Sequence, residues 1–574
     1  MGQDLRDAFV CGYERLVSWA DLLDQINVFP VADSDTGCNL RISLAPLRRF
    51  NGNAENTIRS ILSSATGNSG NIAAGFFSGF LVANSPADLL RSAKDGRDKA
   101  WQAIGDPKPG TILTVFDELV RAFESRDVAL NMESVSRLID NLQQAVWSTY
   151  EFLPELKRAG VVDAGALGMF IYLEGFFRRL VCNTDTFRPV TELFSGRLRI
   201  SSSYEPELVD SHCVDSVVRL DGQPENAVEE LSKHGESLVA VRDGSYLKIH
   251  LHTNNPQAVR TKLESFGDVV RWADDDIGSG AGTIPSPGVL HQAIHVMTDA
   301  AGSVTRKTAR ELGMTLLDSY IIVGDQSVPE TLFSPSELYA QMRRGAKVST
   351  AQASTFERNQ VYQSVLDRYQ DVLYLCVGSV FTGNYDAVMA WKGKNDPDDR
   401  MIAIDSEAAS GRLGTIAIAT ARHSNTVKAA DEVIRYAKDA VKRCEEYVFL
   451  DRLEYLAAGG RLSRTRSFFG DLLHMKPVIS PTAHGAKQVG VARNRDGQLG
   501  FAMDRLKKRL GHDSSPLIVL EYSDNQAWVG NTVKEEVQSR YPLADIVLQP
   551  LSLTSGVHMG PGTWAVAFLP ECWK

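Results

Sequence analysis

The chain has 574 residues, of which 43% are hydrophobic and 23% charged, and its formal net charge is −10 with an isoelectric point near 5.7. This length predicts two to four domains, and the composition is that of a globular protein. The negative charge argues against a nucleic-acid-binding protein, which normally carries a basic surface, but leaves acidic substrates open because a local cluster of cations can outweigh the global charge.

Cysteine usage and hydropathy indicate the compartment. The seven cysteines are scattered without a Cys-x-x-Cys pair, which predicts a reducing environment rather than a disulfide framework. No apolar run approaches the roughly 20 residues that span a bilayer, and the opening MGQDLRDAFV lacks the apolar stretch of a signal peptide. We therefore expect a cytoplasmic protein without a transmembrane segment.

The N-terminal part is predicted to be helical throughout. Apolar residues recur there at three- and four-residue spacing, which predicts about eight helices without a strand and an all-α domain over residues 1–190. Asp33 and Asp35 lie in a turn between two of these helices, in NVFPVADSDTGCNL. Two carboxylates in one turn suit Mg²⁺ held together with substrate phosphates. The alternative is an Asx-turn that leads into a helix N-cap.

A second turn lies in SSATGNSGNIAAGF, where Gly67, Asn68, Ser69 and Gly70 open a helix. Backbone N–H groups, a hydroxyl and the helix dipole can together bind a phosphate. The alternative is an ordinary glycine-containing turn between helices, with close packing at Gly70 and Gly75. Two further glycine turns, in PKPGTILTVFDE and GVVDAGALGMF, also open helices.

These four stretches, taken in order, resemble the nucleotide-binding L domain of dihydroxyacetone kinases, and more closely its relative in bacterial fatty acid kinases, across residues 26–175. The resemblance implies an eight-helix barrel that binds ATP and Mg²⁺. It implies that Asp33 and Asp35 hold Mg²⁺ bridging the ATP phosphates, with Asn27 as a further ligand. Ser34 stands where the family's turn has glycine. The other nucleotide-binding residues that the resemblance implies are Thr36, Asn39, Asn68, Ser69, Gly70 and Asp163.

From His212 the periodicity changes to strand–helix–strand–strand–helix–strand, which predicts a small ferredoxin-like α+β module over residues 205–277. His250 and His252 lie two apart on one strand and share a face, where Cys213 of the first strand can meet them. One cysteine and two histidines suit Zn²⁺; the alternative is two solvent-facing histidines and a buried cysteine. The module resembles the middle domain of fatty acid kinases, which implies structural zinc on these three residues.

The small-residue stretch 278–288, GSGAGTIPSPG, predicts a flexible linker. Beyond it, over residues 289–574, short apolar strands alternate with helices, which predicts an α/β half with a mostly parallel sheet. Ligands of such sheets bind outside the carboxyl ends of the strands, where this chain carries polar loops. Each loop taken alone also fits ordinary capping and turn chemistry.

These loops include VSTAQAST, GSVFTGNY, GGRL and HMGPG, and together they resemble the DegV family of fatty-acid-binding proteins over residues 291–570. The resemblance implies two α/β subdomains with the acyl chain buried between them. The residues that it implies for the fatty acid carboxylate are Thr350, Ser379 and Thr382, and those for catalysis are Arg461 and His558.

The two resemblances together imply a fatty acid kinase whose ATP-binding part and fatty-acid-binding part share one chain. Such a phosphotransferase, with a carboxyl group as acceptor, would convert ATP and a fatty acid to ADP and an acyl phosphate. One alternative is a non-catalytic fatty-acid carrier or sensor with a degenerate kinase domain. Another is a kinase acting on a small keto-sugar, although nothing here resembles the substrate domain of dihydroxyacetone kinases. We expect a homodimer, and as a partner an acyltransferase that accepts the acyl phosphate.

Overall fold

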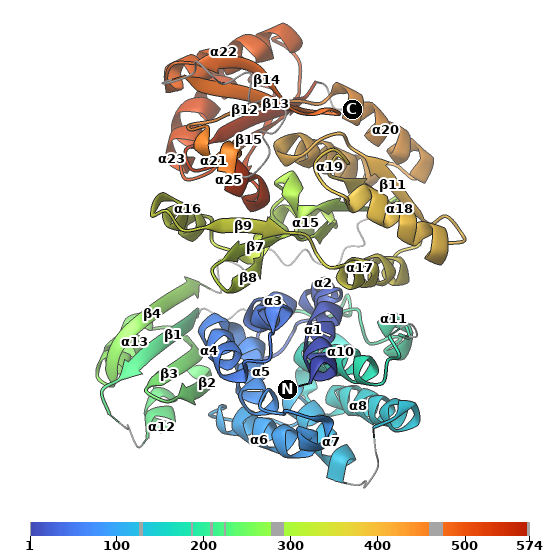
Figure 1. Ribbon diagram of the computed structural model, residues 1–574, viewed down its shortest axis with the longest axis vertical. Coiled ribbons are helices and arrows are strands. Elements are labelled where there is room, and N and C mark those ends of the chain that lie inside the picture. Colours follow the sequence, from blue (N-terminus) through green and yellow to red (C-terminus); the bar gives the residue numbers. More distant parts are fainter. Residues whose placement is uncertain are drawn as a thin grey trace. The chain divides into compact units, whose positions relative to one another are not determined.

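The computed structural model divides by its contacts into two compact units, Met1–Gly288 and Val289–Lys574 (Figure 1). Within the part that the structure describes, no helix is both long and apolar enough to cross a lipid bilayer. The predicted linker at 278–288 lies outside that part. The described residues are 2–124, 130–184, 187–206, 211–222, 226–276, 292–458 and 475–570.

The first unit begins with helices that pack around a central hydrophobic core, which confirms the predicted all-α class. α10 is buried over nearly all of its length and packs along α1. Pro154 divides one predicted long helix into α8 and α9, because proline has no N–H to continue the helical ladder. The helices are α1 (Gln3–Val17), α2 (Ala20–Gln25), α3 (Thr36–Leu44), α4 (Ala54–Ser64), α5 (Gly67–Phe80), α6 (Leu89–Gln102), α7 (Ile112–Glu124), α8 (Met132–Phe152), α9 (Pro154–Ala159), α10 (Ala164–Leu180) and α11 (Val190–Leu193).

A buried ion pair joins α1 to α10 inside this core. Arg15 Nη2 lies 2.8 Å from Glu174 Oε2, and Arg178 Nε lies 3.2 Å from the other carboxylate oxygen of Glu174. The Glu174 side chain is fully buried, so its charge depends on these two guanidinium groups for compensation.

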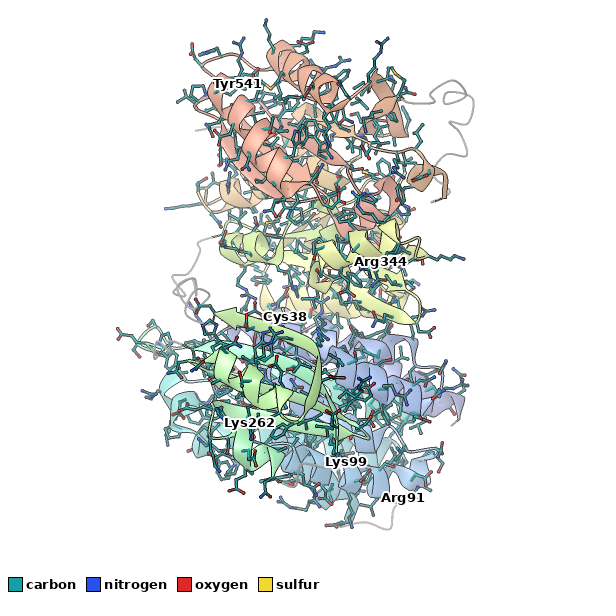
Figure 2. The ribbon with its side chains drawn as sticks, turned by 90° about the vertical axis from the view of Figure 1, so that its left-hand side faces the viewer. Cys38, Arg91, Lys99, Lys262, Arg344 and Tyr541 are labelled. Carbon is teal, nitrogen blue, oxygen red and sulfur yellow. The ribbon has the colours of Figure 1, made fainter. Side chains whose placement is uncertain are left out.

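The middle module is a four-stranded antiparallel sheet in the order β2-β3-β1-β4, which confirms the predicted ferredoxin-like arrangement. One face carries its two helices; Lys262 marks α13 over the strands in Figure 2. The other face, through β2 and β3, packs against α5 of the helical domain. The elements are β1 (His212–Leu220), α12 (Ala227–Leu231), β2 (Glu236–Asp243), β3 (Tyr246–Thr253), α13 (Pro256–Glu264) and β4 (Gly267–Asp276).

β3 is buried on both faces from Leu247 to Thr253. Leu247, Ile249 and Leu251 belong to the core that the sheet shares with α13. Because successive side chains of a strand point to opposite faces, the residues between them face away from that core, towards the helical domain. These residues are Lys248, His250 and His252.

The second unit contains a four-stranded sheet in the order β11-β10-β5-β6, in which every pair is parallel as predicted. Its strands are β5 (His295–Asp299), β6 (Thr315–Leu317), β10 (Val372–Cys376) and β11 (Met401–Asp405). The helices of this part of the chain are α15 (Arg306–Leu312), α16 (Pro335–Arg343), α17 (Thr355–Arg368), α18 (Asn384–Asn395), α19 (Ser410–Ser424) and α20 (Ala430–Arg443).

A six-stranded sheet follows in the order β14-β13-β12-β17-β15-β16, and there the prediction of a mostly parallel sheet is wrong. Among the described strands of this sheet, only β15 and β16 pair in parallel. Strand direction depends on long-range pairing, which apolar runs alternating with helices do not encode. The elements are β12 (Glu445–Phe449), α21 (Glu454–Ala458), β13 (Lys476–Thr482), β14 (Gly485–Ala492), α22 (Arg495–Arg509), β15 (Leu517–Tyr522), α23 (Gln526–Trp528), α24 (Glu535–Arg540), β16 (Asp545–Pro550), α25 (Leu553–Met559) and β17 (Trp564–Leu569).

A three-stranded sheet, in the order β8-β7-β9, completes the second unit. The strands are β7 (Tyr320–Val323), β8 (Gln326–Pro329) and β9 (Val348–Ala351). Glu330, directly after β8, is buried and accepts a 2.9 Å hydrogen bond from the Thr554 amide at the start of α25. Among the described residues its Oε1 has no hydrogen-bond partner, and burial raises the pKa of this carboxyl to about 7.

Candidate functional site

The aspartate turn lies between α2 and α3. Asn27 Nδ2 donates to Asp33 Oδ1 over 2.7 Å, and the side-chain carbonyl of Asn27 accepts from the Thr36 hydroxyl. Asp35 occupies the N-cap position of α3, but its side chain makes no capping bond to a described residue. The Asx-turn and N-cap alternative therefore does not account for the Asp35 carboxylate.

The two carboxylates of this turn are costly to ionise. Burial raises the pKa of Asp33 to about 6, and burial together with the Asp33 charge raises the pKa of Asp35 well above its usual value. Two adjacent carboxylates that resist ionisation form a donor set that fits a divalent cation, which would relieve their repulsion. Asp33 and Asp35 would hold the ion, and Asn27 orients Asp33 beside it.

The turn itself has demanding geometry. Ser34 has φ of +58°, a left-handed conformation that glycine adopts more easily. A Cβ on Gly37 would lie 2.0 Å from the carbonyl oxygen of Ala20, so only glycine allows α3 to start this close to α2.

The second turn opens α5 next to the first. Thr36 Oγ1 lies 3.5 Å from Ser69 Oγ, so the two turns meet through their hydroxyls. Gly67 has φ of +63°, and a Cβ there would lie 2.0 Å from Asn39 Nδ2. A Cβ on Gly70 would lie 2.1 Å from Ser43 Oγ, so the close-packing alternative accounts for Gly70 itself.

Both turns border a cleft of about 970 Å³ between the helical domain and the middle module. This volume is in the range of small-molecule sites. Described residues that line it include Val28–Ala32, Asn68, Ser69, Asp163, Gly235–Val239 and His252–Asn254. The middle module thus supplies one wall of the candidate nucleotide cleft.

Asp163 lies on this cleft and also has a structural role. Its carboxylate caps α10 by accepting a 2.7 Å hydrogen bond from the Ala166 amide. Burial raises the pKa of Asp163 to about 7. The predicted contact of Asp163 with the nucleoside stays a prediction.

His252 lines the cleft on the side of the middle module, and Cys213 and His250 come together with it as predicted. Their ligand atoms lie within 4.8 Å of one another, and Cys213 Sγ is 3.7 Å from His250 Nδ1. The alternative of solvent-facing histidines is wrong, since both rings are buried.

The donor set fits Zn²⁺. Burial and the neighbouring His250 lower the pKa of His252 to about 3, which keeps that imidazole neutral as a ligand must be. His250 Nε2 is buried and has no hydrogen-bond partner among the described residues. The three residues would hold zinc with one position left for a further ligand.

The Cys213–His250–His252 cluster lies near the aspartate turn. The carboxylates of Asp215, Asp35 and Asp33 are among the groups that, after burial, raise the pKa of the Cys213 thiol. His250 in turn acts on Asp35 by lowering its pKa. One region of the first unit therefore gathers both predicted metal sites and the start of α5.

In the second unit, Thr350 at the end of β9 and His558 of α25 come together, with Oγ1 and Nε2 3.5 Å apart. Ser379 and Thr382 lie in the turn after β10, where the Ser379 amide donates to Asp405 and the Thr382 hydroxyl accepts from the Asn384 amide. The ordinary turn alternative thus describes Thr382 in this structure. Arg461 lies outside the described residues.

Two functional candidates escaped the sequence analysis. Asp215 and Lys248 lie on the same face of the sheet as Cys213 and His250, two residues away from each along β1 and β3. The two-residue period that paired the histidines would also have placed these two charges beside them.

Three family models match the chain. They are the DAK2 domain at residues 30–178, the fatty acid kinase A-like middle domain at 211–278, and the uncharacterised protein DegV family at 293–571. The first part of the chain thus combines a helical domain of the dihydroxyacetone kinase L type with a middle module like that of fatty acid kinase. The particular chain fuses this pair to a DegV-family half, as the sequence predicted.

Individual proteins are similar to parts of the chain. The uncharacterized protein SSP1546 of Staphylococcus saprophyticus is 27% identical over 304 residues, covering 47% of this chain and 54% of the relative. The DegV domain-containing protein CPE0026 of Clostridium perfringens is 25% identical over 283 residues, covering 48% and 97%. A fatty-acid-binding DegV family protein from Thermus thermophilus has 21% identity and a TM-score of 0.45, covering 48% and 99%. The chain spans about half the length of the staphylococcal relatives that it matches.

Proposed function

We propose that the chain is a fatty acid kinase that transfers the γ-phosphoryl group of ATP to a fatty acid carboxylate. The observation that carries the proposal is the aspartate turn: Asp33 and Asp35 lie together, burial raises the pKa of both, and their turn adjoins the α5 turn and a cleft of about 970 Å³. A DegV-type half on the same chain supplies the class of acceptor.

The reaction needs positioning and charge neutralisation more than proton transfer. A carboxylate oxygen of the fatty acid attacks the γ-phosphorus, the bond from that phosphorus to the β,γ-bridging oxygen breaks, and ADP leaves with the electron pair. A carboxylic acid is already ionised at neutral pH, so no general base is required. Magnesium held by Asp33 and Asp35 would offset the charge of the phosphates.

The chain's own residues would bind and orient the two substrates. On the nucleotide side, the hydroxyls of Thr36 and Ser69 and the N–H groups at the start of α5 would contact the phosphates. On the acceptor side, Thr350 and Ser379 would bind the carboxylate, and His558, 3.5 Å from Thr350, would orient the transferred group. Arg461 would offset the charge of the incoming carboxylate.

The remaining roles are assigned in the same way. Asn39, Asn68, Gly70 and Asp163 would complete the nucleotide site, and Thr382 would adjoin the carboxylate. Zinc on Cys213, His250 and His252 would be a structural ion. A homodimer, and an acyltransferase that consumes the acyl phosphate, complete the proposal.

The test is oleate-dependent ATP turnover by the purified chain with hydroxylamine present, which traps an acyl phosphate as hydroxamate. We expect hydroxamate from the wild type and from Asp140→Asn, which alters an exposed carboxylate of α8. Asp35→Ala and His558→Ala should abolish it. Protein that carries bound fatty acid and binds Mg–ATP but forms no hydroxamate would overturn the kinase in favour of a fatty-acid carrier.

A further inference from the structure

The buried carboxylate of Asp215 contacts both the start of α5 and the Cys213–His250–His252 cluster. Asp215 of β1 accepts hydrogen bonds from the Thr66 hydroxyl at 3.1 Å, the Gly67 amide at 3.2 Å and Asn71 Nδ2 at 3.2 Å, all at the start of α5. On the side of the sheet it lies 3.2 Å from His250 Nδ1 and 2.9 Å from Lys248 Nζ.

The Asp215 carboxylate is buried together with its two partners from β3. Asp215 is 8% exposed, Lys248 3% and His250 1%. A carboxylate with four hydrogen-bond partners and an ion pair to Lys248 has little freedom, so its position is tied to that of each partner.

Each contact has a consequence for its neighbour. The Gly67 amide has no partner within α5, and it donates to Asp215 instead. A phosphate bound at this helix start would therefore use the amides that follow Gly67. On the other side, a carboxylate on one nitrogen of an imidazole fixes the tautomer and ring orientation and leaves the other nitrogen for a metal. His250 Nε2 is that nitrogen, buried and unpartnered among the described residues.

We propose that Asp215 is a positioning residue that couples the Cys213–His250–His252 cluster to the phosphate-binding start of α5, so that metal on the cluster and nucleotide in the cleft each favour the binding of the other. Lys248 balances the charge of Asp215 and keeps it in place. Metal on the cluster fixes His250, His250 fixes Asp215, and Asp215 fixes Thr66 and Gly67. By thermodynamic linkage the effect acts equally in both directions.

A buried ion pair that only stabilises the fold would have a different signature. Loss of Asp215 would then lower the stability of the unit and weaken both ligands independently, without changing how one ligand affects the other. The coupling factor between the two ligands, rather than either affinity alone, therefore distinguishes a positioning role from a purely structural one.

The experiment uses the full chain, stripped of metal by a chelator and then reloaded with zinc. Affinity for a fluorescent ADP analogue with Mg²⁺ is measured in both states. We expect zinc to tighten analogue binding about 5-fold or more in the wild type and less than about 2-fold in Asp215→Asn. Asp268→Asn is the matched control, because it removes an exposed carboxylate of β4 that pairs with Arg219, and should behave as the wild type.

Cobalt provides the reciprocal readout through its visible absorption. Mg–ADP should also tighten cobalt binding in the wild type and leave it unchanged in Asp215→Asn. Thr66→Val removes one donor on the α5 side only, so it should keep the cobalt spectrum yet reduce the coupling. If Asp215→Asn does not fold, Thr66→Val still tests whether the two ligands are coupled through Asp215.

The inference rests on the proposed nucleotide and zinc sites but not on phosphoryl transfer, since both readouts are binding measurements. If neither ligand binds, the sites proposed above fail together with the inference. If both bind but the wild type shows no coupling, or Asp215→Asn or Thr66→Val keeps the full wild-type factor, only the role of Asp215 is overturned.

Discussion

Replacing Asp33 by asparagine should stabilise the metal-free protein while removing its response to Mg–nucleotide. Asp33 has its pKa raised from 3.8 to about 6 by burial. The difference between these two pKa values corresponds to about 3 kcal/mol, and partial solvent exposure reduces this to roughly 1–3 kcal/mol. Because the folded pKa is raised, the favourable contribution of Asp33 is complete below pH 3.8 and is lost as the pH rises through about 6.

The assay is urea unfolding of the full chain in EDTA, followed by tryptophan fluorescence at pH 8 and at pH 5. The transition of the first unit is identified by its shift with Mg–ADP in the wild type. At pH 8, Asp33→Asn should unfold at higher urea than the wild type, and the difference should shrink at pH 5. The Asn27 contact is kept, because an asparagine at 33 still offers an oxygen to Asn27 Nδ2.

With Mg–ADP added, the order of stability should reverse, since only the wild type gains binding energy. Asp140→Asn, at an exposed carboxylate, should follow the wild type in both conditions. The reasoning is refuted if Asp33→Asn is less stable than the wild type in EDTA at pH 8, or if Mg–ADP stabilises both proteins equally.

Three further variants test other parts of the chain. Glu330→Gln should raise the stability of the second unit at pH 8 by up to about 3 kcal/mol but not at pH 4. Burial raises the pKa of Glu330 to about 7, so the ionised carboxylate lowers stability as the pH rises through that value. An equal gain at both pH values would contradict this. Glu174→Gln should cost about 3–5 kcal/mol in urea unfolding, because it removes the charge of the buried carboxylate that pairs with Arg15 and Arg178, whereas a loss below about 1 kcal/mol would show that these ion pairs contribute little to stability. Gly37→Ala should lower the stability by about 1–3 kcal/mol and weaken Mg–ADP binding, since its Cβ would meet the carbonyl oxygen of Ala20; unchanged binding would mean that α2 moves aside freely.

The features of the fold and the site that could be predicted are those fixed by residues close together in the sequence. Asp33 and Asp35 in one turn, and His250 and His252 on one face of a strand, follow from short spacings that secondary structure converts directly into geometry. The same holds for the glycine turn at α5, where the left-handed backbone at position 67 favours glycine.

Features that depend on long-range pairing could not be predicted. The antiparallel pairing of β17 with β12 and β15 follows from how the whole second unit assembles. The sequence pattern of a strand is the same whether its neighbour is parallel or antiparallel. The contact of Asp215 with Thr66 and Gly67 joins residues almost 150 positions apart. No spacing rule within either segment contains that contact, although the face of β1 that carries Asp215 was predictable.

The double burial of β3 limits how this region of the gene can change. A two-residue turn at Gly244 and Ser245 sets the register of β3 against β2. Deleting one residue there would exchange the two faces of the strand, moving Lys248 and His250 into the apolar core and the leucines into the cleft. Single substitutions in β3 can be accommodated, but a single-residue insertion or deletion in this hairpin should disrupt the metal cluster and the hydrophobic core of the module together.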